Sequence, residues 1–169
     1  MIRRALAVSL VALLAASAPA SAQSITCPSG TTRGGTESEA GKFHWCEQTT
    51  PGGPIRQGPM VGFHPNGRRS FELNFVDGSP RGAVRAWYEG GQPSMTGETR
   101  PDNGTLVLWD ERGRRRAQVD VRDRVVATRA WDEEGREERY QEAKLVKAMP
   151  ANRNLGFLMQ LWAVGIGIQ

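Results

Sequence analysis

Residues 82–113 read GAVRAWYEGGQPSMTGETRPDNGTLVLWDERG, and this stretch decides the fold because it holds one repeat unit and the start of a matching one. A glycine, an aromatic residue five positions later and a second glycine four positions after that recur in order: Gly82, Trp87 and Gly91, then Gly104, Trp109 and Gly113. Extended in both directions, the pattern places four aromatic residues at steps of 24, 22 and 22 positions: Phe63, Trp87, Trp109 and Trp131. A fixed period in this range predicts a repeat array in which each unit stacks on its neighbours.

Each unit has the pattern of a β-hairpin. A turn signal that ends in glycine follows every aromatic residue, as in HPNG up to Gly67 and YEGG up to Gly91, and glycine adopts positive φ angles without a steric penalty. The strand after the turn alternates apolar and polar residues, as in FELNF at residues 71–75. This period of two buries one set of side chains and exposes the other, so we expect four hairpins in a single antiparallel sheet.

The strands before the turns carry two columns of mostly apolar residues on one face of the predicted sheet. Their members stand at equivalent positions of the four units: Met60, Val84, Leu106 and Thr128 in one column, and Gly62, Ala86, Leu108 and Ala130 in the other. The four aromatic residues fall on the opposite parity, beside Arg85 and Arg129. Both faces therefore carry apolar surface, and the alternation alone does not decide which face is buried.

The segment GAVRAWYEGGQ, followed by a return strand and a glycine-containing turn, resembles the bacterial variant of the MORN repeat. That variant is found in antitoxin-like repeat proteins of the YwqK type and in exported proteins. The resemblance covers residues 58–140, about half of the chain, and implies an all-β protein with a single antiparallel sheet of stacked hairpins. Val126 replaces the leading glycine of the fourth unit, which therefore has the character of a terminal cap. Such a short motif specifies a fold better than a function.

The first 22 residues have the pattern of a secretory signal peptide. Arg3 and Arg4 precede an apolar run at residues 5–16, and ASA at residues 20–22 supplies a small-residue cleavage site. The apolar run is too short for a retained membrane anchor. We therefore exclude residues 1–22 from the fold and expect an exported protein, periplasmic or extracellular. Removal of two arginines with the signal lowers the formal net charge from +4 to +2.

The chain has two cysteines, Cys27 and Cys46, and in an exported protein such a pair most often forms one disulfide. The bond would close the N-terminal segment, residues 23–57. Lipid modification of Cys27 is the alternative, but the residues before it lack a lipobox pattern and lie far beyond the apolar run. The polar stretch at residues 29–41 predicts a loop, KFHWCE at 42–47 a strand, and residues 49–59 a turn-rich connector.

The C-terminal part, residues 141–169, combines a cap with an apolar tail. Residues 137–149 contain good helix formers, and we interpret them as the last return strand passing into a short helix, with a capping helix as the alternative. The tail from Leu155 to Ile168 is uncharged, apolar and too short to span a membrane. Such a segment most often packs on its own domain, and the alternatives are contact with a membrane surface or binding of a partner.

No catalytic constellation stands out in the sequence. The two histidines are His44, in a predicted strand, and His64, which we interpret as a solvated turn residue. With the cysteines paired and no histidine cluster, the chain lacks a metal-ligand set, and its serines lack the setting of a nucleophile. We therefore expect no enzymatic activity, no cofactor and no metal.

Basic runs mark two equivalent hairpin tips, at Arg68-Arg69 and in RGRRR at residues 112–116. A strip that binds acidic lipid headgroups or polyanions is one interpretation. Acidic residues close by in the sequence favour the other, in which these arginines are solvated turn residues.

Binding is the function that the pattern favours. Tryptophan and arginine dominate the energetics of protein interfaces, and both types gather in and beside the aromatic column: Trp87, Trp109, Trp131, Arg85 and Arg129. Packing of these tryptophans in the core is the alternative interpretation. The first hypothesis is an exported scaffold that binds a protein or a cell-envelope polymer. An antitoxin-like or immunity protein and a membrane-surface-associated protein are the others, and export disfavours nucleic acid.

Overall fold

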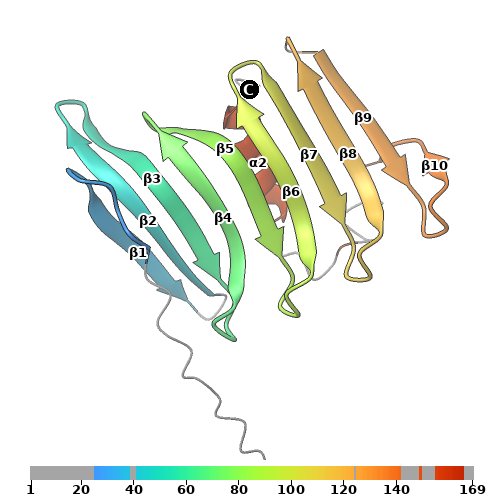
Figure 1. The fold of residues 1–169 in the computed structure, drawn as a ribbon, viewed down its shortest axis with the longest axis horizontal. Coiled ribbons are helices and arrows are strands. Elements are labelled where there is room, and N and C mark those ends of the chain that lie inside the picture. The colour runs from blue at the N-terminus through green and yellow to red at the C-terminus, as the bar shows by residue number, and fades with distance from the viewer. Residues whose placement is uncertain (1–24, 39–40, 124, 142–148, 150–154, 166–169) are drawn as a thin grey trace, which may run out of the picture.

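In the computed structural model, which describes residues 25–38, 41–123, 125–141, 149 and 155–165, ten antiparallel strands form one open sheet in chain order (Figure 1). The strands are β1 (Thr32–Ser38), β2 (Gly41–Thr50), β3 (Gly53–Phe63), β4 (Arg69–Val76), β5 (Ser79–Trp87), β6 (Pro93–Arg100), β7 (Asn103–Trp109), β8 (Arg115–Arg122), β9 (Val125–Trp131) and β10 (Glu137–Glu138). Helix α2 (Leu155–Gly165) packs against β5 and β6. The prediction of an all-β protein with a single antiparallel sheet of hairpins is confirmed, and one short helix stands at the C-terminus. That helix lies in the apolar tail, whereas the helix expected within residues 137–149 falls largely on residues 142–148, outside the described residues. The predicted signal peptide, residues 1–22, lies outside the described residues.

The tips of the four predicted hairpins, β3–β4, β5–β6, β7–β8 and β9–β10, share one geometry. The glycine that ends each turn signal has a positive φ angle: 81° at Gly67, 93° at Gly91, 74° at Gly113 and 80° at Gly135. In the second tip the Tyr88 N–H donates to Gln92 O (2.9 Å) and the Gly91 N–H donates to Tyr88 O (2.8 Å). This is a type I turn closed by a glycine bulge. Gly90 does not have a positive φ angle, so only the second glycine of this tip needs its conformational freedom.

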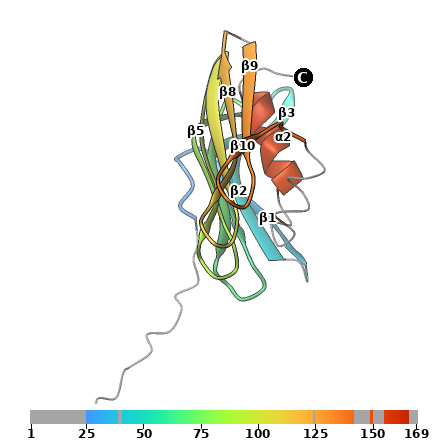
Figure 2. The same cartoon turned by 90° about the vertical axis from the view of Figure 1, so that its right-hand side faces the viewer.

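The two columns that contain Val84 and Ala86, and not the aromatic column, belong to the face that α2 covers. The core consists of alternating residues from β3 to β8 and one helix residue: Met60, Phe71, Leu73, Phe75, Val84, Ala86, Met95, Leu106, Leu108, Ala117, Val119, Val121 and Leu158. Met149 and Tyr88 are buried in the same cluster. Figure 2 shows the sheet edge-on as a single layer with α2 against this face. The C-terminal helix therefore settles which side of the sheet is the core.

Two glycines in the sheet interior let large neighbours approach the backbone. A Cβ atom at Gly62 would stand 2.2 Å from a ring carbon of Phe71. At Gly97 it would stand 2.7 Å from Thr105 O and 2.8 Å from Leu106 Cδ1. Close-packed interiors leave no room for such contacts, so both positions need a residue without a side chain.

The N-terminal part belongs to the same sheet, which corrects two expectations. The polar stretch that was predicted as a loop contains β1, the edge strand, which pairs with β2 from Thr32 opposite Glu47 onward. Gly34 has a packing reason, because a Cβ atom there would stand 2.5 Å from Trp45 Nε1. The stretch 49–59, expected as a connector, is instead the end of β2, a tight turn and the first half of β3.

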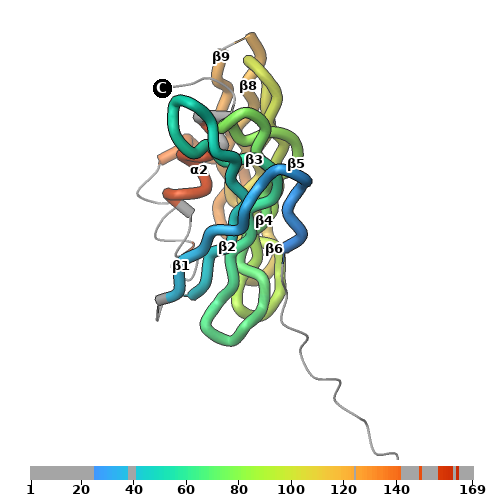
Figure 3. The backbone as a smooth tube through the Cα atoms, turned by 90° about the vertical axis from the view of Figure 1, so that its left-hand side faces the viewer, coloured from blue at the N-terminus to red at the C-terminus, as the bar shows by residue number. Residues whose placement is uncertain are grey.

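The predicted disulfide between Cys27 and Cys46 is present, with 5.5 Å between the two Cα atoms. It joins the start of the described chain to β2, where Cys46 is buried. The Pro28 ring lies against Gly58 of β3, because a Cβ atom there would stand 2.7 Å from Pro28 Cδ. The first described residues consequently lie on the sheet face opposite α2, as both edge views show (Figure 2, Figure 3).

At the C-terminal end, β10 pairs with β9 as the expected return strand, whereas residues 142–148 and 166–169 lie outside the described residues. In the described part of the tail, Leu158 of α2 is fully buried. The ring of Phe157 stacks at 6.4 Å from that of Phe43. The tail thus packs on its own sheet over residues 155–165. No described helix has both the length and the apolar character that crossing a bilayer requires.

Candidate binding face

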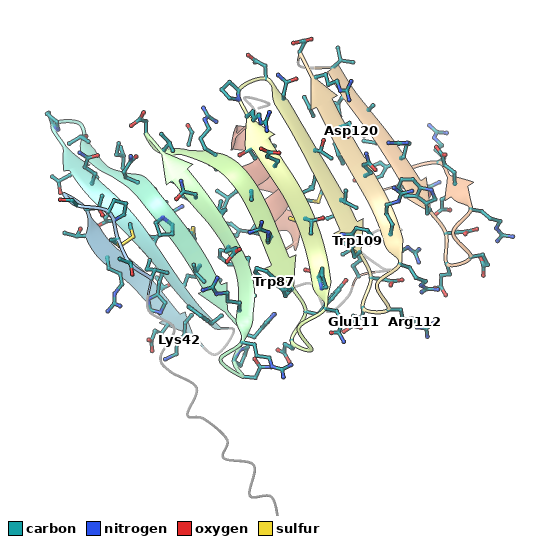
Figure 4. The ribbon with its side chains drawn as sticks, in the orientation of Figure 1. Lys42, Trp87, Trp109, Glu111, Arg112 and Asp120 are labelled. Carbon is teal, nitrogen blue, oxygen red and sulfur yellow. A yellow bond between two sulfur atoms is a disulfide. The ribbon has the colours of Figure 1, made fainter. Side chains whose placement is uncertain are left out.

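All five predicted binding residues lie on the sheet face opposite α2, which we call the open face: Arg85 and Trp87 on β5, Trp109 on β7, and Arg129 and Trp131 on β9. Figure 4 looks onto this face and labels Trp87 and Trp109 near the same end of their strands. Because every second strand lies about 10 Å further along a sheet, equivalent side chains recur at that spacing. The structure therefore brings the predicted residues onto one surface, and their role in binding stays a prediction.

The indole of Trp109 lies across the neighbouring strand. Its Nε1–H donates to Thr96 Oγ1 on β6 at 3.2 Å. Both Trp109 and Trp87 are half-buried, so each has a part of its surface against the sheet and a part in solvent. Such an indole offers a rigid apolar surface at little cost in side-chain entropy.

Trp131 differs from these two tryptophans because arginines cover it. The guanidinium of Arg115 stands 3.8 Å from the ring centroid, and that of Arg129 stands at 5.9 Å. Only 8% of the Trp131 surface remains exposed. Cation–π contacts therefore occupy this ring within the fold, and the accessible part of the aromatic column is the pair Trp87 and Trp109.

Two matched arginine–carboxylate pairs flank the tryptophans. Glu72 accepts hydrogen bonds from Arg69 and from Arg85, the latter at 3.0 Å. Asp120 accepts one from Arg129 at 3.4 Å. Surface pairs of this kind contribute little to stability, but they orient the guanidinium groups on the open face.

Two residues to which the sequence assigns no binding role, His64 and Tyr88, position the backbone of the tryptophans. His64 Nε2–H donates to Trp87 O at 2.8 Å, and the Tyr88 hydroxyl donates to Trp109 O at 2.7 Å. His64 is half-buried, so its interpretation as a solvated turn residue is wrong. Each donor directly follows the aromatic residue of its own unit, His64 after Phe63 and Tyr88 after Trp87. This shared position in the repeat is the sequence signal that could have predicted their common role.

The environment of Tyr88 keeps it protonated. Burial raises the pKa of Tyr88 far above its ordinary value, and the negative charges of Glu111 and Asp110 raise it further. The hydroxyl therefore remains a donor to Trp109 O over the whole physiological range of pH.

The basic hairpin tips are used within the fold. Arg68 Nη1 donates to the carbonyl oxygens of Glu89 (3.2 Å) and Gly90 (3.0 Å) in the next tip. Arg114 Nε donates to Asp110 Oδ2 at 2.8 Å. Arg114 Nη1 also donates to Glu133 O in the next tip, so both arginines join tip to tip. These contacts agree with structural turn arginines better than with an anion-binding strip.

The described residues contain no group of three or more histidine, cysteine, aspartate or glutamate side chains placed to hold a metal ion. The chemistry available on the open face is apolar contact through indoles and charge-assisted hydrogen bonding through guanidinium and carboxylate groups. This arrangement suits recognition of a ligand surface.

The geometry defines a class of protein: an open antiparallel sheet of β-hairpin repeats, with a helix against one face and tryptophan, arginine and carboxylate side chains on the other. No protein-family model matches this chain, and no curated protein matches it in sequence. Membership of the MORN-variant family therefore stays a proposal that rests on the repeat spacing quoted above.

Proposed function

We propose that this protein is an exported, non-catalytic repeat scaffold whose open face binds an extended segment of a partner protein. The observation that carries the proposal is the pair Trp87 and Trp109. Two half-buried indoles occupy equivalent positions of adjacent units on the face that the helix leaves uncovered. Tryptophan and arginine are the residues most enriched at interface hot spots, and Arg85 stands two positions from Trp87.

The spacing of the repeats favours an extended partner. Equivalent side chains on β5 and β7 lie about 10 Å apart, and three residues of an extended chain cover about the same distance. A polyproline II segment, which repeats every three residues over about 9 Å, fits this spacing and is a known ligand of aromatic grooves. A partner segment that runs across the strands would place a side chain at each tryptophan.

Export is supported by two independent features of the chain. Residues 1–22 have the pattern of a cleavable signal peptide, and the Cys27–Cys46 disulfide is of the kind that persists in oxidising compartments. The resemblance to the MORN variant, which is found in exported bacterial proteins, points to the same compartment.

Site-specific photo-crosslinking in cells that express the protein tests the proposal. The crosslinking residue replaces Thr105, which is exposed on the open face, and in a second strain it replaces Gln160, which is exposed on α2. We expect a discrete crosslinked protein from position 105 only. Addition of Trp109→Ala should abolish that product while the protein remains exported and folded.

Three results would contradict the proposal. One is crosslinking of equal strength from both positions, and another is persistence of the product in Trp109→Ala. The third is a crosslinked species that a glycan-degrading enzyme removes and a protease does not, because the ligand would then be an envelope polymer. Mass spectrometry of the excised product identifies the partner and the segment that touches position 105.

A further inference from the structure

A hollow of about 560 Å³ lies on the open face beside the first described residues. Ile25 and Thr26 form one wall, and side chains of β3, β4 and β5 form the rest. Arg85 borders the hollow and stands two positions before Trp87 on the same strand. The hollow therefore adjoins the tryptophan surface.

The wall of the hollow is held in place by covalent and packing contacts. Thr26 precedes Cys27, whose disulfide partner Cys46 is 1% exposed in β2. The next residue, Pro28, packs its ring on the bare backbone of Gly58. The N-terminal segment is thus fastened to the sheet at Cys27 and Pro28, directly after the two residues that form the wall.

The charge in the hollow is positive. Arg69, Arg81 and Arg85 line it with a single carboxylate, Glu72. Glu72 accepts one Nη1–H from Arg69 and one from Arg85. The side chains of Arg69 and Arg85 are nevertheless 46% and 55% exposed, and each guanidinium has five N–H donors. Arg69 and Arg85 therefore have more N–H donors than Glu72 uses, and these are available to a second anion.

We infer that the hollow binds a carboxylate side chain from an acidic segment of the partner protein. The existing Glu72 contacts show that these arginines are already spaced to hold a carboxylate, and the guanidinium fork matches that group. Val61 and Ala83 line the hollow with apolar surface, which accommodates the methylene groups of a glutamate side chain. The choice of a peptide ligand rests on the function proposed above.

Titration of the purified, disulfide-bonded protein with a blocked triglutamate peptide tests the inference. The matched probe is a blocked triglutamine peptide, and the readout is the NMR resonance of the arginine Nε–H groups. Arg85→Gln removes one positive charge, and Ala83→Leu fills the hollow while it keeps every charge. We expect each substitution to weaken triglutamate binding about tenfold. If Ala83→Leu does not fold, Arg85→Gln carries the test alone.

Arg136→Gln is the control, because Arg136 pairs with Asp132 as Arg85 pairs with Glu72 and has no place in the candidate binding face. It stands at the β9–β10 tip, at least four strands from Arg85 and about 19 Å away across the sheet, and a tripeptide spans only about 10 Å. Unchanged binding in Arg136→Gln, together with the weakening above, supports the assignment. No saturable binding, equal binding of triglutamine, or equal weakening by Arg136→Gln overturns it. Tighter binding of inorganic phosphate or of a galacturonate oligomer also overturns it.

This titration and the crosslinking experiment fail independently. The titration uses purified protein without a partner. A negative titration therefore leaves the evidence for a crosslinked partner protein unchanged and contradicts only the inference that the bound segment is acidic. The converse result is triglutamate binding that depends on Arg85, but no crosslinked protein in cells. It would remove the proposed function and leave a carboxylate site without an assigned partner.

Discussion

His64 and Tyr88 stand at the same position of successive units, and each donates a hydrogen bond to the carbonyl oxygen of the next unit's tryptophan. Asp110 holds this position in the third unit, and its carboxylate has no proton to donate at neutral pH. It binds Arg114 instead, and Arg114 Nη1 donates to Glu133 O at 2.8 Å in the fourth tip. An imidazole, a hydroxyl and a carboxylate at this one position therefore each support a hydrogen bond between successive units.

The environment of Asp110 predicts that part of the stability of the fold is lost in acid. Burial acts to raise the pKa of Asp110, but hydrogen bonds from the Arg114 backbone and side chain, and the Arg114 charge, outweigh it and hold this pKa below its ordinary value of 3.8. A lowered pKa in the folded state contributes stability above the unfolded-state pKa, about 3.9, and that contribution is lost as the pH falls through the folded-state pKa. We expect Asp110→Asn to lower the free energy of unfolding by about 1 to 3 kcal/mol at neutral pH and to flatten its decline below about pH 4.

Urea unfolding at a series of pH values measures this effect. Asp132→Asn is the control, because Asp132 makes the same contacts with Arg136 in the next tip. Its side chain is 24% exposed, against 6% for Asp110, so the change in the free energy of unfolding should be smaller. If the free energy of unfolding declines equally steeply below pH 4 in the wild type and in Asp110→Asn, protonation of this carboxyl group is not linked to folding.

Gly91 tests the tip geometry. Its φ angle is 93°, where a β-branched side chain is strained, so we expect Gly91→Val to lower the free energy of unfolding by about 1 to 3 kcal/mol. Gly90→Ala is the control, because Gly90 does not have a positive φ angle and its Cβ atom would meet only the flexible end of Gln92. Thermal unfolding that is the same in both variants would contradict the turn assignment.

At the scale of the element, β7 shows how one strand serves both faces of the sheet. Leu106 and Leu108 are fully buried on the core face, whereas Val107 and Trp109 belong to the open face and are half-buried. The alternation places a core residue next to a candidate binding residue along the same seven-residue strand. A slip of one residue in the register would exchange the two sets.

This division predicts that two adjacent substitutions lower the free energy of unfolding by different amounts. Leu108→Ala removes a fully buried side chain and should lower the free energy of unfolding by about 2 to 5 kcal/mol. Trp109→Ala should cost less, because part of its indole is in solvent and its main anchor is one hydrogen bond to Thr96. Chemical unfolding of both variants measures the difference. A larger loss for Trp109→Ala would assign the tryptophan to the core and weaken the proposed binding role.

On the scale of the whole molecule, the sheet depends on contacts made outside the repeats. A single sheet has one face to bury, and α2 covers it with Leu158 at the centre. At the other end of the chain, the disulfide fastens the N-terminal segment to the opposite face. The repeat array thus holds a terminal segment against each of its faces, which compensates for the small core of an open sheet.

Loss of the disulfide should lower the free energy of unfolding substantially. Closing a loop with a sequence separation of 19 residues should stabilise the fold by about 3 kcal/mol on the chain-entropy estimate. We expect Cys27→Ser with Cys46→Ser to lower the free energy of unfolding by that amount, measured by urea unfolding. Intact mass after alkylation without reduction should show no modified thiol and a mature chain that begins at Gln23. Two alkylated cysteines, or a lipid on Cys27, would contradict the prediction.

The sequence by itself determined the repeat, the hairpins, the disulfide and the parity of the strands, because all of these depend on spacing along the chain or on the small number of cysteines. Glycines at a fixed place after each aromatic residue specify the tips, and alternation in FELNF specifies a two-faced strand. The five candidate binding residues were predictable for the same reason, since equivalent positions of a repeat share one face.

Only the tertiary structure decided which face is the core, because α2 is remote in the sequence from the strands that it covers. The strand β1 was also unpredictable, since Gly34 and Gly35 are explained by residues of the neighbouring strand β2 and not by a turn preference. The roles of His64 and Tyr88 depend on a carbonyl oxygen more than twenty residues away. The hollow beside Ile25 likewise needs the disulfide and three strands together. Contacts between distant residues determined these features, and local pattern does not encode such contacts.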